Sequence, residues 1–294
     1  MSTCAVSTQA PTRKKVTIHT LMEKKAKGEK ITFLTAYDFP TAVIEDKAGI
    51  DIILVGDSLG MCVYGFDNTL PVTMDMMVNH AKAVKKGAPN CFIIGDMPYM
   101  SYQVSVEQAI TNAGRLMQEA GVDSVKLEGG IEMADKVSAI TKAGIPVIGH
   151  IGLTPQSVAM LGGFKAQGRD AVAAIKIIED AKALEEAGCV CILLEAIPAE
   201  LAKIITENSK IPTLGIGAGP YCDGQVLVVH DLLGFFGGHV AKFVKQYANM
   251  NEYIEKALIE YKADVENKKF PGPEHYYKIS EEELEKLKKV LEKR

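Results

Sequence analysis

Several features that mark other classes of protein are missing from this sequence. No apolar run approaches the roughly 20 residues that cross a bilayer, so no transmembrane helix is predicted. The net charge of −4 gives no reason to expect nucleic acid or an anionic membrane as a partner. The six cysteines form no CxxC pair and no spaced zinc set, which predicts buried, reduced thiols in a cytoplasmic protein.

The first 16 residues also lack an apolar h-region, so they do not form a secretory signal. They are rich in Ser and Thr, lack acids and end near Arg13-Lys14-Lys15. We expect a disordered start, with a mitochondrial presequence as the alternative.

Short apolar strands alternate with longer helical patterns along most of the chain. The expected strands are Ile31–Thr35, Ile52–Val55, Cys91–Gly95, Ser124–Leu127, Pro146–Gly149, Val190–Leu194, Pro212–Gly215 and Gln225–Val229. Most of the helical patterns lie between them: Pro40–Ala48, Met74–Lys86, Val106–Ala120, Glu132–Ala143, Ala171–Ala187 and Ala199–Glu207. Repeated strand, helix and strand units are typical of α/β proteins with a parallel sheet.

Eight such units favour a closed (β/α)₈ TIM-type barrel over an open sheet. We expect one domain over residues 1–294, with the barrel at about 31–262. An N-terminal helix over Ile18–Lys27 is expected to plug the bottom of the barrel. A C-terminal helical extension is expected to contain helix over Val240–Lys262 and a charged helix over Ser280–Lys293, in a tail at about 278–294.

Polar side chains follow the apolar strands where each strand ends. Asp57 and Ser58 follow the second strand, Asp96 the third, Glu128 the fourth and Glu195 the sixth. In a barrel these ends share one face, so the four carboxylates are expected to converge there with Lys126 and His150. A single Asp at a strand end is more often a helix N-cap, but the joint pattern favours a site.

Four acids packed together need a cation, because like charges repel and one lysine does not offset them. Hard carboxylate oxygens without Cys or His at ligand spacing suit Mg²⁺. Lys126 and Glu128 lie two apart on a strand and should point to the same side. Glu195 ends an apolar strand, so we expect a raised pKa that suits a general base.

Two further patterns leave alternatives open. His150 is equally compatible with a role in the site and with a satisfied buried histidine. The glycine-rich Gly215–Gly219 is compatible with phosphate binding or with close packing of the backbone.

Several long motifs resemble one enzyme family, the ketopantoate hydroxymethyltransferases. These motifs are Thr35–Asp38, Gly56–Gly60, Thr69–Asp75, Asp96–Pro98, Lys126–Gly130, Gly149–Gln156, Ile211–Thr213, Gly215–Gly219 and Asp223–Gln225. The resemblance covers about residues 16–277 and implies a barrel of the phosphoenolpyruvate mutase and isocitrate lyase group.

The resemblance implies a transferase that moves a one-carbon unit from 5,10-methylenetetrahydrofolate to 3-methyl-2-oxobutanoate. The product is 2-dehydropantoate, for pantothenate and coenzyme A synthesis. The matching positions imply that Asp57, Asp96 and Glu128 serve one Mg²⁺ per subunit, and that Glu195 is the proton acceptor. Asp57, Ser58, Asp96 and Lys126 are implied to contact the keto acid. The resemblance also implies a large homo-oligomer, typically a decamer.

Two other functions compete with the transferase. One is a Mg²⁺-dependent C–C or C–P lyase or mutase of the same superfamily, acting on a 2-oxo acid or a related acid. The absence of a Lys-Lys-Cys-Gly type segment counts against it. The other is a non-catalytic barrel, which would be expected to have lost some of the acids at the strand ends.

Overall fold

The structure is a computed structural model that describes residues 13–293 except 164, 236 and 239. The sequence predicts disorder, with a presequence as the alternative, over residues 1–16. Of these, residues 1–12 lie outside the described residues. For Arg13 to Val16 the expectation of disorder is wrong. Arg13 donates a hydrogen bond to the Ile50 carbonyl at 2.8 Å, and the Lys15 ammonium lies 2.6 Å from Asp123. These contacts fix the segment against the barrel.

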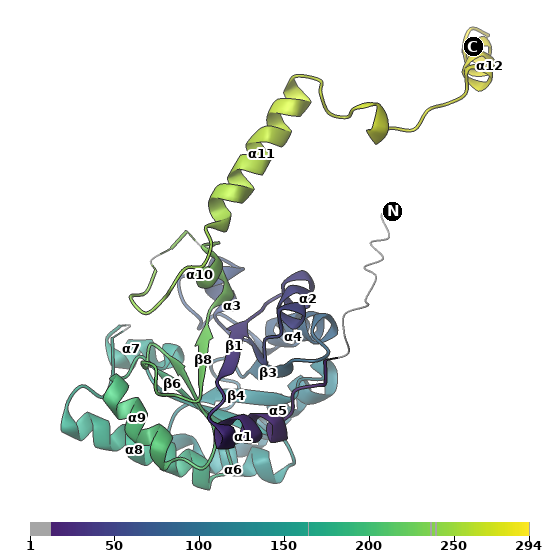
Figure 1. Cartoon of the computed structure of the whole chain (residues 1–294). Helices are drawn as coiled ribbons and strands as arrows, with labels where there is room; N and C mark the ends of the chain where they lie inside the picture. Colours follow the sequence, from purple (N-terminus) through teal and green to yellow (C-terminus); the bar gives the residue numbers. More distant parts are fainter. Residues whose placement is uncertain (1–12, 164, 236, 239, 294) are drawn as a thin grey trace.

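Eight parallel strands close into a barrel in chain order, as the sequence predicts (Figure 1). They are β1 (Ile31–Thr35), β2 (Ile52–Val55), β3 (Phe92–Asp96), β4 (Ser124–Glu128), β5 (Val147–Gly152), β6 (Cys191–Glu195), β7 (Thr213–Ile216) and β8 (Gly224–Leu227). β1 pairs with both β2 and β8, which closes the barrel.

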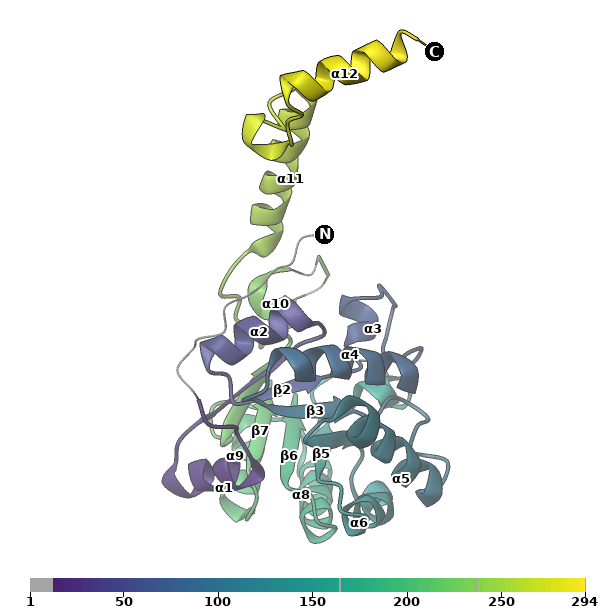
Figure 2. The ribbon, with the colours of Figure 1, turned by 90° about the vertical axis from the view of Figure 1, so that its right-hand side faces the viewer.

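Helices surround this barrel on most sides (Figures 1 and 2). Those up to the end of β7 are α1 (Ile18–Lys27), α2 (Phe39–Ala48), α3 (Leu59–Cys62), α4 (Met74–Gly87), α5 (Val106–Arg115), α6 (Ala134–Lys142), α7 (Val158–Leu161), α8 (Ala171–Glu186) and α9 (Ala199–Asn208). The π-helical turn η1 (Leu116–Ala120) extends α5, and the 3₁₀ turns η2 (Ile131–Met133) and η3 (Pro155–Ser157) precede α6 and α7. Side-chain caps start several of these helices; Asp38, for example, accepts the Thr41 N–H at the start of α2.

The interior of the barrel is packed with apolar side chains. One buried cluster contains Phe33, Ile52, Phe92 and Leu193, among others from the strands, and Leu21 of α1 packs into the same cluster. Leu21 is completely buried, so α1 covers one end of the barrel, as predicted. The polar ends of the strands therefore face the other end, which is the usual place of active sites in this fold.

The chain leaves the barrel after β8. It runs through α10 (Val229–Leu233) to α11 (Met250–Glu266), then through η4 (Pro273–His275) to α12 (Glu281–Leu291). The helix expected over Val240–Lys262 is wrong in its first ten residues, which are not helical. Two contacts with the barrel side hold this segment: the Tyr247 N–H donates to the Leu232 carbonyl, and the Phe243 ring packs against Gly217. Tertiary contacts thus override the helical pattern.

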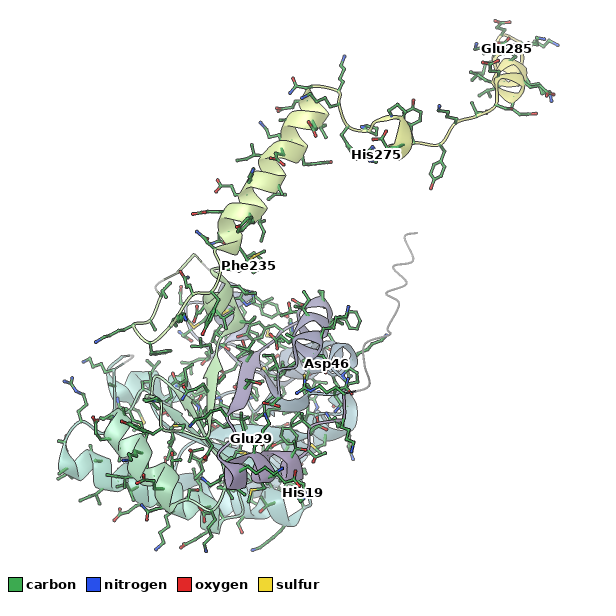
Figure 3. All side chains as sticks on the ribbon, viewed as in Figure 1. His19, Glu29, Asp46, Phe235, His275 and Glu285 are labelled. Carbon is green, nitrogen blue, oxygen red and sulfur yellow. The ribbon has the colours of Figure 1, made fainter. Side chains whose placement is uncertain are left out.

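We call residues 250–293 the arm. It projects away from the barrel, and Figure 3 shows its side chains, out to Glu285 in α12, standing clear of the barrel surface. No residue of α11 or α12 is buried. Within the described ranges, no helix combines the length and apolar character needed to cross a membrane.

Candidate active site

The predicted site residues converge at the mouth of the barrel. A cavity of about 130 Å³ is lined by Asp57, Ser58, Asp96, Lys126, Glu128, His150 and Glu195, together with apolar side chains such as Leu193 and Ile216. The strand register explains why they meet: Asp96 pairs with Lys126 across β3 and β4, and Glu128 pairs with His150 across β4 and β5. The convergence predicted from the strand ends is therefore confirmed.

Lys126 is the central cation of this cavity. Its ammonium lies 2.7 Å from Asp96 Oδ1 and 3.4 Å from Glu128 Oε1, and all three residues are buried. Burial alone would lower the pKa of Lys126, but Asp96 and Glu128 outweigh it and raise that pKa. Burial also opposes ionisation of Glu128, yet Lys126 and His150 hold the pKa of Glu128 below its usual value. Lys126 and Glu128 thus form a charged pair in the folded protein.

Asp57 and Asp96 are less well compensated. The Asp57 N–H donates to Asp96 Oδ2 at 3.1 Å, so the two acids lie next to each other. Burial raises the pKa of both, and the Asp96 charge raises the pKa of Asp57 further. Two adjacent buried carboxylates of this kind hold a proton or need another cation.

The donor chemistry of these acids fits Mg²⁺. Across the described part of the chain, no three acidic, His or Cys side chains converge as a ready-made metal cage. Mg²⁺ does not require one, since it usually keeps several waters and takes one or two carboxylates together with substrate oxygens. Asp57 and Asp96 supply two hard oxygen ligands whose raised pKa values a divalent cation would offset.

His150 lies between two of the acids. Its Nε2 is 3.1 Å from Glu195 Oε2 and its Nδ1 is 3.5 Å from Glu128 Oε1. Among the described residues neither nitrogen has a partner in hydrogen-bonding geometry, so both are contacts between charges. Burial would lower the pKa of His150, but Glu128 and Glu195 raise it to about 9. A protonated imidazole therefore faces Glu195 at the end of the otherwise apolar β6.

Ser58 lies at the rim of the cavity. Its hydroxyl is 2.8 Å from the hydroxyl of Tyr37, a fully buried residue of the β1–α2 loop. Tyr37 sits in the Thr35–Asp38 motif, and the sequence offered no reason to give it a role beside Ser58.

Two residues of the site were not identified from the sequence. Gln156, in η3, donates from Nε2 to Asp57 Oδ2 at 2.9 Å, and its N–H donates to Glu128 Oε2 at 2.9 Å. Tyr102 donates to Gln156 Oε1 at 2.8 Å. Both are uncharged, and neither lies in a strand or in a periodic apolar pattern. The sequence signal that could have indicated Gln156 is its place at the end of the Gly149–Gln156 motif, just after β5.

Close packing accounts for two of the glycines in Gly215–Gly219. A Cβ on Gly219 would lie 2.4 Å from Ala199, and one on Gly217 would lie 2.7 Å from the Phe243 ring. Both glycines have positive φ values, of 76° and 62°. The packing alternative therefore explains them without a bound phosphate.

Comparison with known proteins gives a consistent picture. The family model described as ketopantoate hydroxymethyltransferase matches residues 15–273. A protein of Syntrophomonas wolfei named 3-methyl-2-oxobutanoate hydroxymethyltransferase is 56% identical over 273 residues, covering 93% of this chain and 99% of its own. A protein of the same name from Thermoanaerobacter sp. is 56% identical over 269 residues, covering 92% and 98%.

Solved structures share the fold at low sequence identity. A phosphonopyruvate hydrolase solved with oxalate and Mg²⁺ has a TM-score of 0.57 and 14% identity, covering 94% of this chain and 98% of its own. A 2,3-dimethylmalate lyase, described as a member of the PEP mutase/isocitrate lyase superfamily, has a TM-score of 0.56 and 16% identity, covering 94% and 95%. These similarities support the barrel fold expected for that superfamily.

Proposed function

This chain belongs to the ketopantoate hydroxymethyltransferase family, and we propose that the buried charges at its barrel mouth carry out that family's reaction. It is a hydroxymethyltransferase that acts on 3-methyl-2-oxobutanoate in pantothenate biosynthesis. We take 5,10-methylenetetrahydrofolate as the one-carbon donor and 2-dehydropantoate as the product. The lyase or mutase alternative is set aside, because relatives at 56% identity carry the transferase name.

One Mg²⁺ per subunit completes the site in this proposal. Asp57, Asp96 and Glu128 would hold it, and the raised pKa values of Asp57 and Asp96 support the need for a cation there. When bound, Mg²⁺ supplies Lewis-acid polarisation of the keto acid. Glu128 is already held by Lys126 and by the Gln156 N–H, so its position is set before any ligand enters.

The keto acid would bind against Asp57, Ser58, Asp96 and Lys126. The cavity, at about 130 Å³, has room for a small acid but not for a folate, which must approach from outside the mouth. Lys126 would bind an oxygen of the substrate, since its ammonium is the one buried lysine of this cavity. Ser58, whose hydroxyl contacts Tyr37, would donate a hydrogen bond to the keto acid or accept one from it at the rim of the cavity.

Glu195 would remove the proton from C3 of the keto acid. Its side chain is the most exposed of the four acids, at 15%, so it can reach a bound substrate. His150, whose pKa is raised, places its Nε2 3.1 Å from Glu195 Oε2 and so positions that side chain at the cavity. The enolate carbon would then bond to the folate methylene carbon as the first of its two C–N bonds opens. Water would supply the hydroxyl oxygen as the second C–N bond breaks, and tetrahydrofolate would leave with the proton taken from C3 and the proton released by water.

The proposal also covers the domain organisation, the cellular location and the oligomeric state of the protein. We take residues 1–294 as one domain and the cytoplasm as the location, which suits the free thiols among the described cysteines. A homodecamer fits the exposed apolar side chains of the arm, such as Leu258 of α11 and Leu287 of α12. Light scattering of the purified chain measures the mass, and a monomer at micromolar concentration would refute the oligomer.

The observation that carries this function is the buried set of Lys126, Asp96, Glu128 and Asp57 beside the His150–Glu195 contact. The test is product formation followed by NMR, with the protein, Mg²⁺, 3-methyl-2-oxobutanoate and methylenetetrahydrofolate. We expect 2-dehydropantoate only when all four are present. Formation of product by chelator-treated protein without added metal would refute the proposed Mg²⁺ site. The absence of product with folded protein and all components would refute the proposed donor or substrate.

A further inference from the structure

Gln156 joins the ends of three strands at the barrel mouth. Its side chain is buried in η3, directly after β5. The amide Nε2 donates to Asp57 Oδ2 at 2.9 Å and to the Met97 carbonyl at 3.0 Å. Its backbone N–H donates to Glu128 Oε2 at 2.9 Å. One residue therefore contacts two of the three acids assigned to the metal.

Tyr102 determines which way the Gln156 amide faces. The Tyr102 hydroxyl donates to Gln156 Oε1 at 2.8 Å, has the Glu128 carbonyl as a second, longer acceptor at 3.1 Å, and accepts the Glu128 N–H at 3.1 Å. With Oε1 facing the hydroxyl, Nε2 must face Asp57, and the amide cannot flip without losing these bonds.

The consequence for Asp57 is a fixed carboxylate. Oδ2 accepts from Gln156, which leaves Oδ1 as the oxygen to which the described residues donate no hydrogen bond. For Glu128, Oε2 is held by the Gln156 N–H while Oε1 faces Lys126 and His150. The Gln156 side chain thus orients Asp57, and the backbone N–H of the same residue orients Glu128, without adding a charge to the site.

We propose that Gln156 is a positioning residue for the divalent cation, with Tyr102 holding its amide in place. This inference rests on the metal site of the proposed function. Residues that orient metal ligands in this way typically change metal affinity or activity by 10–100-fold when they are replaced. Gln156 acts through Asp57 and Glu128 and does not itself need to touch the substrate.

The experiment measures Mn²⁺ binding to the metal-free full-length protein by EPR, without substrate. Gln156→Met keeps the unbranched shape but removes the amide hydrogen bonds to Asp57, to the Met97 carbonyl and to Tyr102, while the backbone N–H can still hold Glu128. We expect Mn²⁺ affinity to fall by about 10–100-fold. Gln225→Met is the matched control, because Gln225 is exposed on β8 and donates only to the Gly219 carbonyl. The control should bind Mn²⁺ as the wild type does.

Tyr102→Phe provides a second, independent variant. It removes the hydroxyl that orients Gln156, and we expect a smaller loss of Mn²⁺ affinity in the same direction. It also decides the matter if Gln156→Met does not fold by circular dichroism. The Mg²⁺ concentration for half-maximal product formation should rise in parallel, a shift that a purely structural role would not produce.

The outcomes separate this inference from the proposed function. Folded Gln156→Met and Tyr102→Phe proteins with unchanged Mn²⁺ affinity would overturn the positioning role and leave the function standing. A wild type that does not bind Mn²⁺ would overturn the metal site and the role with it. A wild type that binds Mn²⁺ but forms no 2-dehydropantoate would overturn the proposed function alone.

Discussion

The barrel and the arm use similar residues in opposite surroundings. Leu193 inside the barrel is 3% exposed, whereas Leu258 on α11 is 62% exposed. Lys126 in the barrel mouth and Lys286 on α12 each lie 2.7 Å from a carboxylate, but the first is buried and the second is mostly exposed. The difference teaches that burial, more than the identity of the contact, decides what a pair of residues contributes.

The same difference separates two tasks of the chain. The barrel encloses titratable side chains whose pKa values differ from those in water, and such shifted pKa values are typical of sites of acid–base chemistry. The arm leaves apolar side chains uncovered, which is the condition for contact with another surface. If the two tasks are separate in this way, changes inside the barrel should have larger effects than changes in the arm.

Replacing the buried lysine should be the most damaging of these changes. Lys126→Met leaves Asp96 and Glu128 without their cation, and breaking such a buried pair typically costs about 3–5 kcal/mol of the free energy of unfolding. Lys286→Met is the matched control in the arm and should cost under about 1 kcal/mol. Urea unfolding without Mg²⁺ measures both. Equal losses would contradict the contrast.

Glu45 should give the barrel a pH dependence that the arm lacks. It is buried in α2, and neither carboxylate oxygen has a hydrogen-bond partner in the part of the chain that the structure describes. Burial, and to a smaller extent repulsion from Asp38, raises the pKa of Glu45 to about 8. Because the folded state holds a proton that the unfolded state has lost, stability falls as the pH rises from about 4.5 and levels off above about 8.

Glu45→Gln removes this titration. At pH 9 we expect the free energy of unfolding of the variant to exceed that of the wild type by about 2–4 kcal/mol. The full pKa shift corresponds to roughly 5 kcal/mol, but water entry relaxes the buried charge and reduces the effect. Near pH 4 the two proteins should be equally stable. Glu255→Gln, on exposed α11, is the control and should show no such trend. Urea unfolding across this pH range measures the difference. If the difference in stability between the wild type and Glu45→Gln stays constant across this range, Glu45 is solvated and the prediction is wrong.

Removing the end of the arm should have the smallest effect. Deletion of residues 278–294 takes away α12, none of whose residues is buried. We expect the rate per subunit of C3 proton exchange in the keto acid to stay within about twofold of the full chain. NMR in D₂O measures that rate. A much larger drop would place part of the active site in the arm.

Much of the fold was predictable because the strands are apolar runs. β1 and β2 have the predicted bounds, while β3, β4, β5 and β6 run one to three residues further than predicted. The extra residues include Asp96, Glu128 and Glu195, which stay in the sheet because pairing with the neighbouring strand continues beyond the apolar run. The strand ends thus predicted which acids and which lysine converge.

Other features of the fold and the site could not be predicted, because they depend on contacts between residues far apart in the sequence. Gln156 and Tyr102 are uncharged loop residues whose importance comes from the acids they meet across the barrel mouth. Glu45 lies in a helix in which a charged residue is normally solvated, yet packing covers it. The non-helical segment before α11 follows from contacts with the barrel, such as that of Phe243 with Gly217.

In the proposed reaction, Glu195 removes the C3 proton of a keto acid bound at the barrel mouth. The most direct measurement is exchange of that proton in 3-methyl-2-oxobutanoate, followed by NMR in D₂O with protein and Mg²⁺ and without folate. We predict exchange with the wild type and a rate lower by about 10²–10⁴-fold with Glu195→Gln. Exchange at the wild-type rate with a folded Glu195→Gln protein would contradict the assignment of the base.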